Sequence, residues 1–285
     1  MTTKPATVIS SEVRTMVSQN SGKKYRISIG LPYAYHESRG SGGPFDKPLK
    51  HWPVVYLVDG DLYFGMVTDI VRAMAWCGTT TDAIVIGIGY PQDKDPQEAW
   101  RNQYAWRNWD LIPFRDEESE KGAEAWVKRP APTGGAEPFL HFIQHELIPI
   151  IDRDFQTDTR RRILAGHSWG GTFVAYAMFE APALFTSYII GSPGLAEGDR
   201  FIFRREELYA KRHKKLAARV HLWAGGLEES SRGNSTLSDT IRFGAVLEGR
   251  QYKGLTLVKQ IIANEHHCEV IAPGFQAGLK LALKK

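Results

Sequence analysis

The sequence has little cysteine and no long apolar run. Only two cysteines, Cys77 and Cys268, occur among 285 residues, which excludes the disulfide framework that holds small secreted domains together. We expect both thiols to be free. Apolar stretches such as residues 54–58 and 84–88 are far shorter than the roughly 20 residues that a membrane-spanning helix requires. The sequence therefore predicts no membrane span and no membrane partner.

Targeting and nucleic-acid signals are also missing. Residues 1–12 are polar and lack the apolar stretch and cleavage site of a secretory signal, so we expect a cytoplasmic protein. The formal net charge is only +4, and the basic residues between Arg200 and Lys215 alternate with Glu206, Glu207 and apolar residues. That pattern is typical of a solvated helix face. Without a concentrated basic patch or a recognisable module, we expect no nucleic-acid partner.

Cofactor and metal signatures are absent as well. The sequence has no phosphate-binding glycine loop with its lysine, no H-E-x-x-H motif and no C-x-x-C pair. His266, His267, Cys268 and Glu269 follow one another, but adjacent residues in a loop rarely point at one ion. We therefore predict no cofactor and no metal.

Strands and helices alternate along most of the chain. A hydrophobic content of 42% is enough for one large core, so we expect one domain over residues 1–285. Turn residues at 20–22 predict an N-terminal hairpin of strands, and residues 36–50 read as a loop. Further strands are predicted at 54–58, 83–88, 162–165, 188–190, 220–224 and 255–262, and helices at about 64–76, 139–147 and 275–283. This order predicts an α/β fold with a mostly parallel central sheet and helices on both faces.

Residues 92–137 interrupt this alternation. The segment has no clear periodicity, is rich in charge and proline, and contains four of the eight tryptophans. A structureless connection of this length is uncommon, which favours a functional loop or cap inserted into the domain. We expect it to line an acyl or aromatic pocket. Within it we predict that Trp106, Arg107 and Trp109 contact the substrate.

The sharpest motif is Gly-His-Ser-Trp-Gly at residues 166–170, which lies between a predicted strand and a predicted helix. A G-x-S-x-G turn of this kind exposes a nucleophilic serine, here Ser168, at the end of a strand. The flanking glycines let backbones pass closely where a Cβ would clash. The serine also sits at a helix N-terminus, where backbone N–H groups favour developing negative charge. We predict Ser168 as the nucleophile and the N–H of Trp169 as a donor to an oxyanion.

A serine hydroxyl needs a base to remove its proton, and the fold places that histidine after the acid in the chain. Four histidines follow Ser168. His213 lies in the basic helical run and His221 lies inside a predicted strand. The loop after the last strand therefore leaves His266 and His267 as candidates, with His267 preferred partly for its spacing to the final apolar helix.

The acid should follow the preceding strand, because catalytic groups gather just beyond strand ends in such sheets. Glu228 is the first candidate, and Glu229 and Asp239 remain open as alternatives. A second oxyanion donor must come from another loop at the same edge. Strand 54–58 ends in Asp-Gly-Asp, whose tight turn suggests the backbone N–H of Asp61.

From about residue 54 to its C-terminus, the sequence also matches a set of family motifs. These are Val-Tyr-Leu-Val-Asp-Gly at 55–60, Arg107-x-x-Asp110-Leu-Ile-Pro, Gly134-Gly135, Glu146-Leu-Ile-Pro, the Ser168 motif, Ser192-Pro193 and His267-x-x-Val270. The chain thereby resembles the α/β-hydrolase esterase family that includes the enterobactin and salmochelin esterases and, more distantly, esterase D and the mycolyltransferases. One departure is that Gly-Leu-Ala-Glu follows Ser192-Pro193, where relatives usually continue with serine and tryptophan.

The resemblance implies an α/β-hydrolase fold and metal-free hydrolysis of carboxylic esters by a serine, histidine and acid triad. Carried over residue by residue, it assigns Ser168, Glu228 and His267 to the triad, and the N–H groups of Asp61 and Trp169 to the oxyanion site. We expect a serine esterase with a small-molecule ester substrate. The same triad also serves thioesterases, lactonases, amidases and acyltransferases. The alternative from another class is a catalytically silent binding protein of this fold. The sequence predicts neither a particular ester nor an oligomeric state.

Overall fold

One eight-stranded sheet organises the chain. The computed structural model describes residues 6–35, 51–92, 94–229 and 235–285, and the loop expected at 36–50 lies outside these ranges. The strands are β1 (Ser11–Val17), β2 (Lys24–Gly30), β3 (Trp52–Leu57), β4 (Ile84–Gly89), β5 (Thr157–His167), β6 (Ser187–Gly191), β7 (Lys215–Gly225) and β8 (Lys253–Ile262). Their order across the sheet is β1-β2-β4-β3-β5-β6-β7-β8. The pairs β1/β2 and β2/β4 are antiparallel and the remaining pairs are parallel, which confirms the predicted hairpin and mostly parallel sheet.

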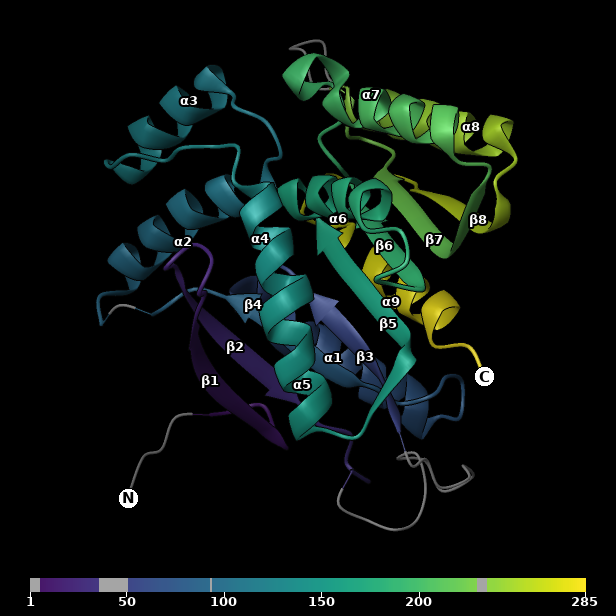
Figure 1. Cartoon of the computed structure of the whole chain (residues 1–285). Helices are drawn as coiled ribbons and strands as arrows, with labels where there is room; N and C mark the ends of the chain where they lie inside the picture. Colours follow the sequence, from purple (N-terminus) through teal and green to yellow (C-terminus); the bar gives the residue numbers. More distant parts are fainter. Residues whose placement is uncertain (1–5, 36–50, 93, 230–234) are drawn as a thin grey trace.

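Helices cover both faces of this sheet, also as predicted (Figure 1). Helices α1 (Gly60–Trp76) and α9 (Ile271–Ala282) pack on one face. The other face carries α6 (Trp169–Glu180), α8 (Thr236–Arg250) and a continuous helical stretch composed of α4 (Ala136–Phe142), the π-helical η1 (Ile143–Leu147) and α5 (Ile148–Asp154). Helix α7 (Glu197–Arg212) packs against α6. The expected α/β-hydrolase architecture is therefore confirmed.

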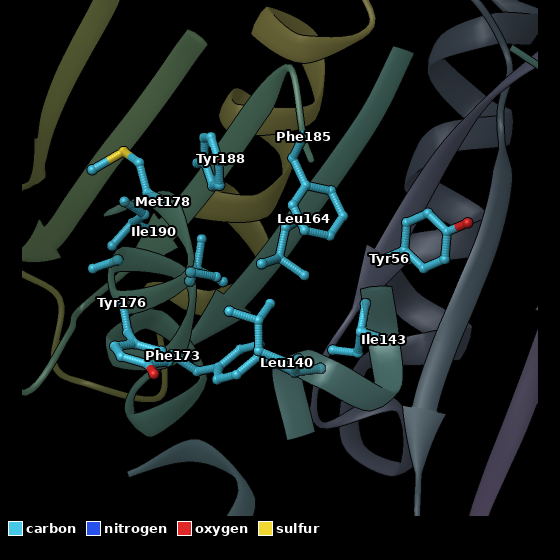
Figure 2. Close-up of a cluster of buried hydrophobic side chains, with 14 of the residues drawn as sticks. Tyr56, Leu140, Ile143, Leu164, Phe173, Tyr176, Met178, Phe185, Tyr188 and Ile190 are labelled. Atoms are coloured by element: carbon cyan, nitrogen blue, oxygen red, sulfur yellow. The ribbon is translucent and has the colours of Figure 1, made fainter. Parts of the chain in front are cut away.

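Alternation along the strands divides the core between the two faces. Val55 and Ile163 point to the face of α1 and α9, where they belong to a buried cluster with Phe275. Their neighbours Tyr56 and Leu164 belong to the larger cluster on the opposite face. Figure 2 shows part of this second cluster, with side chains from η1, α4 and α6 gathered over Leu164. Burial on both faces explains the continuous apolar runs of these strands.

The prediction of an aperiodic loop at 92–137 is wrong for most of that segment. It contains α2 (Pro96–Leu111) and α3 (Glu117–Val127), which Figure 1 shows as a helical pair beside the sheet. Asp95 accepts a hydrogen bond from the N–H of Gln97 and is followed by Pro96, and Asp116 accepts from the N–H groups of two first-turn residues. These are ordinary helix-start signals. The segment is thus a helical insert, and we use that name for residues 92–137 below.

Two observations bear on the surface of the molecule. Cys77 and Cys268 are both free and exposed, which confirms the expectation of unpaired thiols. None of the helices in the described ranges is long and apolar enough to span a membrane.

Candidate active site

The loops that follow the parallel strands meet at one edge of the sheet. Strands β3, β5, β6, β7 and β8 are successive neighbours and run in the same direction. Their carboxyl ends therefore lie side by side. The loop after β5 carries Ser168, the loop after β7 carries Glu228 and the loop after β8 carries His267. Three residues that are far apart in the sequence are thus delivered to a single edge.

The turn at Ser168 has the strained geometry that the motif predicts. Strand β5 ends at His167 and α6 begins at Trp169, so the whole reversal occurs at Ser168, with φ 60° and ψ −128°. Its N–H donates a 2.9 Å hydrogen bond to the carbonyl of Gly191 on β6. A Cβ at Gly166 would lie 2.5 Å from the carbonyl carbon of Gly170. Only glycine permits this close approach of strand and helix, and it holds the serine off the strand end.

Glu228 binds the ring of His267. Its Oε2 lies 2.6 Å from Nδ1 of His267, while its Oε1 accepts hydrogen bonds from the Ser192 hydroxyl at 2.6 Å and from the Gly225 N–H at 2.7 Å. Burial alone would raise the pKa of Glu228, but these hydrogen bonds outweigh burial and lower it below the ordinary value. The carboxylate therefore stays ionised and fixes the imidazole, whose Nδ1 donates to it when the ring is protonated there.

The alternative site residues are engaged elsewhere. Glu229 is exposed and accepts hydrogen bonds from the N–H and the hydroxyl of Ser238. Asp239 is buried on α8 and forms a 2.6 Å ion pair with Arg200. His266 is exposed. The sequence leaves three carboxylates and two histidines as candidates for the acid and the base. Of these, the structure brings Glu228 and His267 together.

His167 provides a neutral support for His267. The two rings pack with their centroids 4.5 Å apart, and the ring of Trp223 stacks near His167 at 6.4 Å. Burial, aided by the nearby His267, lowers the pKa of His167 to about 3. His167 is therefore uncharged near neutral pH and places no positive charge beside the His267 ring. Since His167 precedes Ser168 in the chain, this contact also holds His267 close to the serine turn.

The turn after β3 is anchored from two sides. Asp59 has φ 53°, is buried, and accepts two hydrogen bonds from Arg107 of α2, at 2.8 and 2.9 Å. Burial alone would lower the pKa of Arg107, but the charge of Asp59 outweighs this effect and raises it. A Cβ at Gly60 would lie 2.5 Å from the carbonyl carbon of Gly87 on β4. The buried Asp59–Arg107 pair thus ties the helical insert to this turn.

The two backbone groups predicted as oxyanion donors both stand at helix N-termini. Asp61 is in the first turn of α1, and Trp169 is the first residue of α6. The Asp61 side chain accepts hydrogen bonds from the N–H of Tyr90 at 2.6 Å and from Arg26 at 3.1 Å. These bonds favour the charged carboxylate, but burial outweighs them and raises the pKa of Asp61. Because β3 and β5 are parallel neighbours, both helices begin at the same sheet edge. Their role as oxyanion donors remains a prediction.

A pocket of about 370 Å³ opens beside the serine turn. It is lined by Tyr104, Asn108, Ser119, Gly122, Ala123, Trp126 and Trp169. Trp106 and Trp109 do not line this pocket. The ring of Trp106 packs near Tyr90, and that of Trp109 packs where a Cβ of Gly135 would be. Arg107 is bound to Asp59. The substrate contacts predicted for Trp106, Arg107 and Trp109 therefore stay a prediction, and this geometry does not favour it.

Two supporting residues escaped the sequence analysis. Ser192 holds the second oxygen of Glu228, and Asp59 holds the turn that precedes Asp61. Ser192-Pro193 and the Asp-Gly turn were both visible as motif pieces, but neither carries a local signal for its partner.

Within the described ranges, no group of three or more His, Cys, Asp or Glu side chains is arranged to hold a metal ion.

Comparison with known proteins gives one family match and several relatives. The family model described as "Putative esterase" matches residues 18–234. The ferri-bacillibactin esterase BesA of Bacillus subtilis is 30% identical over 240 residues, which cover 83% of this chain and 76% of that protein. The siderophore enterobactin esterase of Emericella nidulans is 32% identical over 190 residues, covering 65% of this chain and 59% of the relative.

A solved structure supports the fold. The BES protein from Bacillus cereus superposes with a TM-score of 0.80 at 24% identity, and the match covers 100% of both chains. At 24% identity, this similarity supports the fold alone. It agrees with the sheet order and helix placement described above.

Proposed function

Because the chain belongs to the Putative esterase family and is a carboxylic ester hydrolase of the α/β-hydrolase fold, we propose that it cleaves its substrate through an acyl-enzyme on Ser168. His267 is the base and Glu228 orients it. The observation that carries this proposal is the 2.6 Å contact between Glu228 Oε2 and His267 Nδ1. It engages Nδ1 and leaves Nε2 as the nitrogen that can accept the serine proton.

The reaction follows from these roles. His267 Nε2 takes the proton of Ser168 while the serine oxygen bonds to the ester carbonyl carbon. The negative charge that forms on the carbonyl oxygen is stabilised by the backbone N–H groups of Asp61 and Trp169. The tetrahedral intermediate then breaks its bond to the alcohol oxygen, which receives the proton from His267. Water repeats the sequence on the acyl-enzyme and releases the acid together with free Ser168.

The substrate we infer is a small-molecule carboxylic ester. Two relatives carry names that describe siderophore esterases, so siderophore esters are the first class to test. The same three side chains are chemically suited to thioesters, lactones, amides and acyl transfer. Initial rates on matched ester, thioester and amide substrates with one common acyl group separate these alternatives.

The choice of acid can be tested directly. Glu228→Gln is expected to lower kcat by about 10³- to 10⁴-fold, because the amide no longer holds the imidazole in the reactive tautomer or stabilises its charge. Glu229→Gln, its exposed neighbour, should stay within about twofold of the wild-type enzyme. Steady-state hydrolysis of one ester by both variants measures this. A large loss in Glu229→Gln with little loss in Glu228→Gln would move the acid to the neighbouring residue.

A further inference from the structure

Ser192 has a backbone conformation that residues with a Cβ rarely adopt. Its φ is 38°, in the left-handed region that favours glycine. Pro193 follows it, and a proline drives the preceding residue towards the extended region instead. Such strain persists only where the surrounding structure over-determines the conformation, and it gathers at functional sites. Ser168 also has a positive φ, but Ser192 has no part in the steps of the proposed reaction.

Two hydrogen bonds hold Ser192 in this conformation. The residue directly follows β6, and its N–H donates a 2.8 Å hydrogen bond to the carbonyl of Trp223 on β7. Its hydroxyl donates a 2.6 Å hydrogen bond to Oε1 of Glu228. Ser192 is only 1% exposed, so its hydroxyl acts inside the protein and does not touch a substrate.

The contacts of Glu228 are divided between its two carboxylate oxygens. Oε1 accepts hydrogen bonds from the Ser192 hydroxyl and from the N–H of Gly225, whereas Oε2 contacts Nδ1 of His267. Hydrogen bonds from a hydroxyl to a carboxylate are short and strong. A buried carboxylate that loses such a donor is destabilised. The two donors on Oε1 therefore fix the rotation of the carboxylate and leave Oε2 for the histidine.

Several other ionisable groups surround Glu228 and His267. They are His167 at the end of β5, Tyr63 on α1, Arg107 on α2 with its partner Asp59, and Cys268 beside His267. Burial lowers the pKa of His167 to about 3 and raises the pKa of Tyr63, so both are uncharged near neutral pH. Arg107 and Asp59 neutralise each other. On the acid side of neutrality, Glu228 and His267 are therefore the members of this group whose charge can change.

We propose that Ser192 is a positioning residue whose hydroxyl holds Oε1 of Glu228 and thereby keeps Oε2 directed at Nδ1 of His267. This rests on the proposed function, in which His267 is the base. The need for a hydroxyl explains why a residue with a Cβ stands where the backbone favours glycine. Ser192 acts through Glu228 and His267, so its removal should affect the chemical step and leave substrate binding unchanged.

Ser192→Ala removes the hydroxyl and keeps the Cβ. We expect kcat to fall by about tenfold to a hundredfold, the usual effect of losing a hydrogen bond to a charged group, with KM within about twofold of wild type. The loss should be smaller than in Glu228→Gln, because the carboxylate remains. Steady-state hydrolysis of one ester gives both constants. Wild-type kcat in Ser192→Ala overturns the proposal.

The pH profile separates positioning from a structural role. Burial alone would raise the pKa of Glu228, but hydrogen bonds from His267, Ser192 and Gly225 outweigh it and lower that pKa. Without the Ser192 hydroxyl the carboxylate becomes more basic and holds the proton on His267 more tightly. The acid limb of kcat/KM should therefore move to higher pH in Ser192→Ala. An acid limb at the wild-type position contradicts the proposed role.

Glycine at the same position removes the hydroxyl and relieves the strain. We expect Ser192→Gly to have the same loss of kcat and the same shift of the acid limb as Ser192→Ala, but a higher unfolding temperature than Ser192→Ala. Thermal unfolding and the pH profile of both variants test this. Recovery of wild-type kcat in Ser192→Gly would mean that the position only shapes the loop, and it overturns the proposal.

Thr172 supplies a structural control for the same loop. From α6 its hydroxyl accepts a 2.8 Å hydrogen bond from the N–H of Gly194, two residues after Ser192, and it has no printed contact with Glu228. We expect Thr172→Val to lower the unfolding temperature and to leave the acid limb in place. A shift as large as that in Ser192→Ala would mean that a loosened loop is enough to produce it, which overturns the assignment of Ser192.

Failure of this proposal and failure of the proposed function give different results. If Glu228 is not the acid, Glu228→Gln keeps its activity, and the role of Ser192 falls with that of Glu228. If Glu228 is the acid but Ser192 does not position it, Glu228→Gln is slow while Ser192→Ala and Ser192→Gly have wild-type kcat and pH profiles. We expect all three variants to be slow, with Glu228→Gln the slowest.

Discussion

Replacement of Ser168 by alanine is expected to lower kcat by about 10⁴- to 10⁶-fold, because the enzyme loses the only atom that forms the acyl-enzyme. The turn itself should survive. The Ser168 N–H bonds to the Gly191 carbonyl through the backbone, and no side-chain hydrogen bond to the serine hydroxyl supports the fold among the described contacts. Steady-state hydrolysis of an ester, with thermal unfolding as a check on the fold, measures both effects.

Glycine at the same position separates loss of chemistry from loss of structure. The backbone at Ser168, with φ 60° and ψ −128°, is a conformation that glycine adopts without the strain imposed by a Cβ. Ser168→Gly should therefore be as inactive as Ser168→Ala, with an equal or higher unfolding temperature. Retention of wild-type turnover by either variant would sink the assignment of the nucleophile.

Replacement of His267 by alanine is expected to reduce kcat to within about tenfold of Ser168→Ala, since serine and base act as one unit. The adjacent His266→Ala is the matched control and should change kcat by no more than a few-fold. The reason for the difference is geometric. His267 contacts Glu228 and packs on His167, whereas His266 is an exposed loop residue.

The double variant sharpens this comparison. If Ser168 and His267 act in one proton transfer, Ser168→Ala/His267→Ala should be no slower than the worse single variant. Kinetics with a sensitive fluorogenic ester resolve such residual rates. Multiplication of the two single losses would mean that the residues act independently, and near-normal activity of His267→Ala would transfer the base to its neighbour.

The central sheet and the serine turn were accessible from sequence because their signals are local. Strands buried on both faces give continuous apolar runs, as at 54–58 and 84–88. The glycines around Ser168 are dictated by backbone contacts, such as that between Gly166 and Gly170, which no residue with a Cβ could make. Both requirements can be read from the residues themselves, so the prediction and the structure agree there.

The helical insert was hidden for a physical reason. Helix α2 packs against α3, α4 and α6, so its apolar residues are distributed around the helix and give no single stripe. Its charged residues are also partly internal, as Arg107 and Asp110 are both buried. The capping residues Asp95 and Asp116, which the sequence analysis did not use, would have been the better guide to these helices, because caps depend on helix ends and not on which faces are covered.

The acid and the pocket depend on tertiary contacts. Three carboxylates follow β7: Glu228 and Glu229 are adjacent in the loop, and Asp239 lies ten residues after Glu229 on α8. Position alone favours Glu228 without excluding Asp239. Only packing pairs Asp239 with Arg200 and Glu228 with His267. The pocket could not be predicted from sequence position either. Asn108 and Tyr104 share one helix face, which can be predicted only once α2 is recognised as a helix.

The most direct test of the account is covalent labelling of the purified protein with a fluorophosphonate probe, followed by mass spectrometric mapping, with Ser168→Ala as the control. Fluorophosphonates react with a serine only when its hydroxyl is activated by a neighbouring base. We expect one labelled peptide, modified at Ser168, and no labelling of the variant. Folded wild-type protein that stays unlabelled, or is labelled at another serine, would contradict the proposed mechanism and favour a catalytically silent binding protein of the same fold.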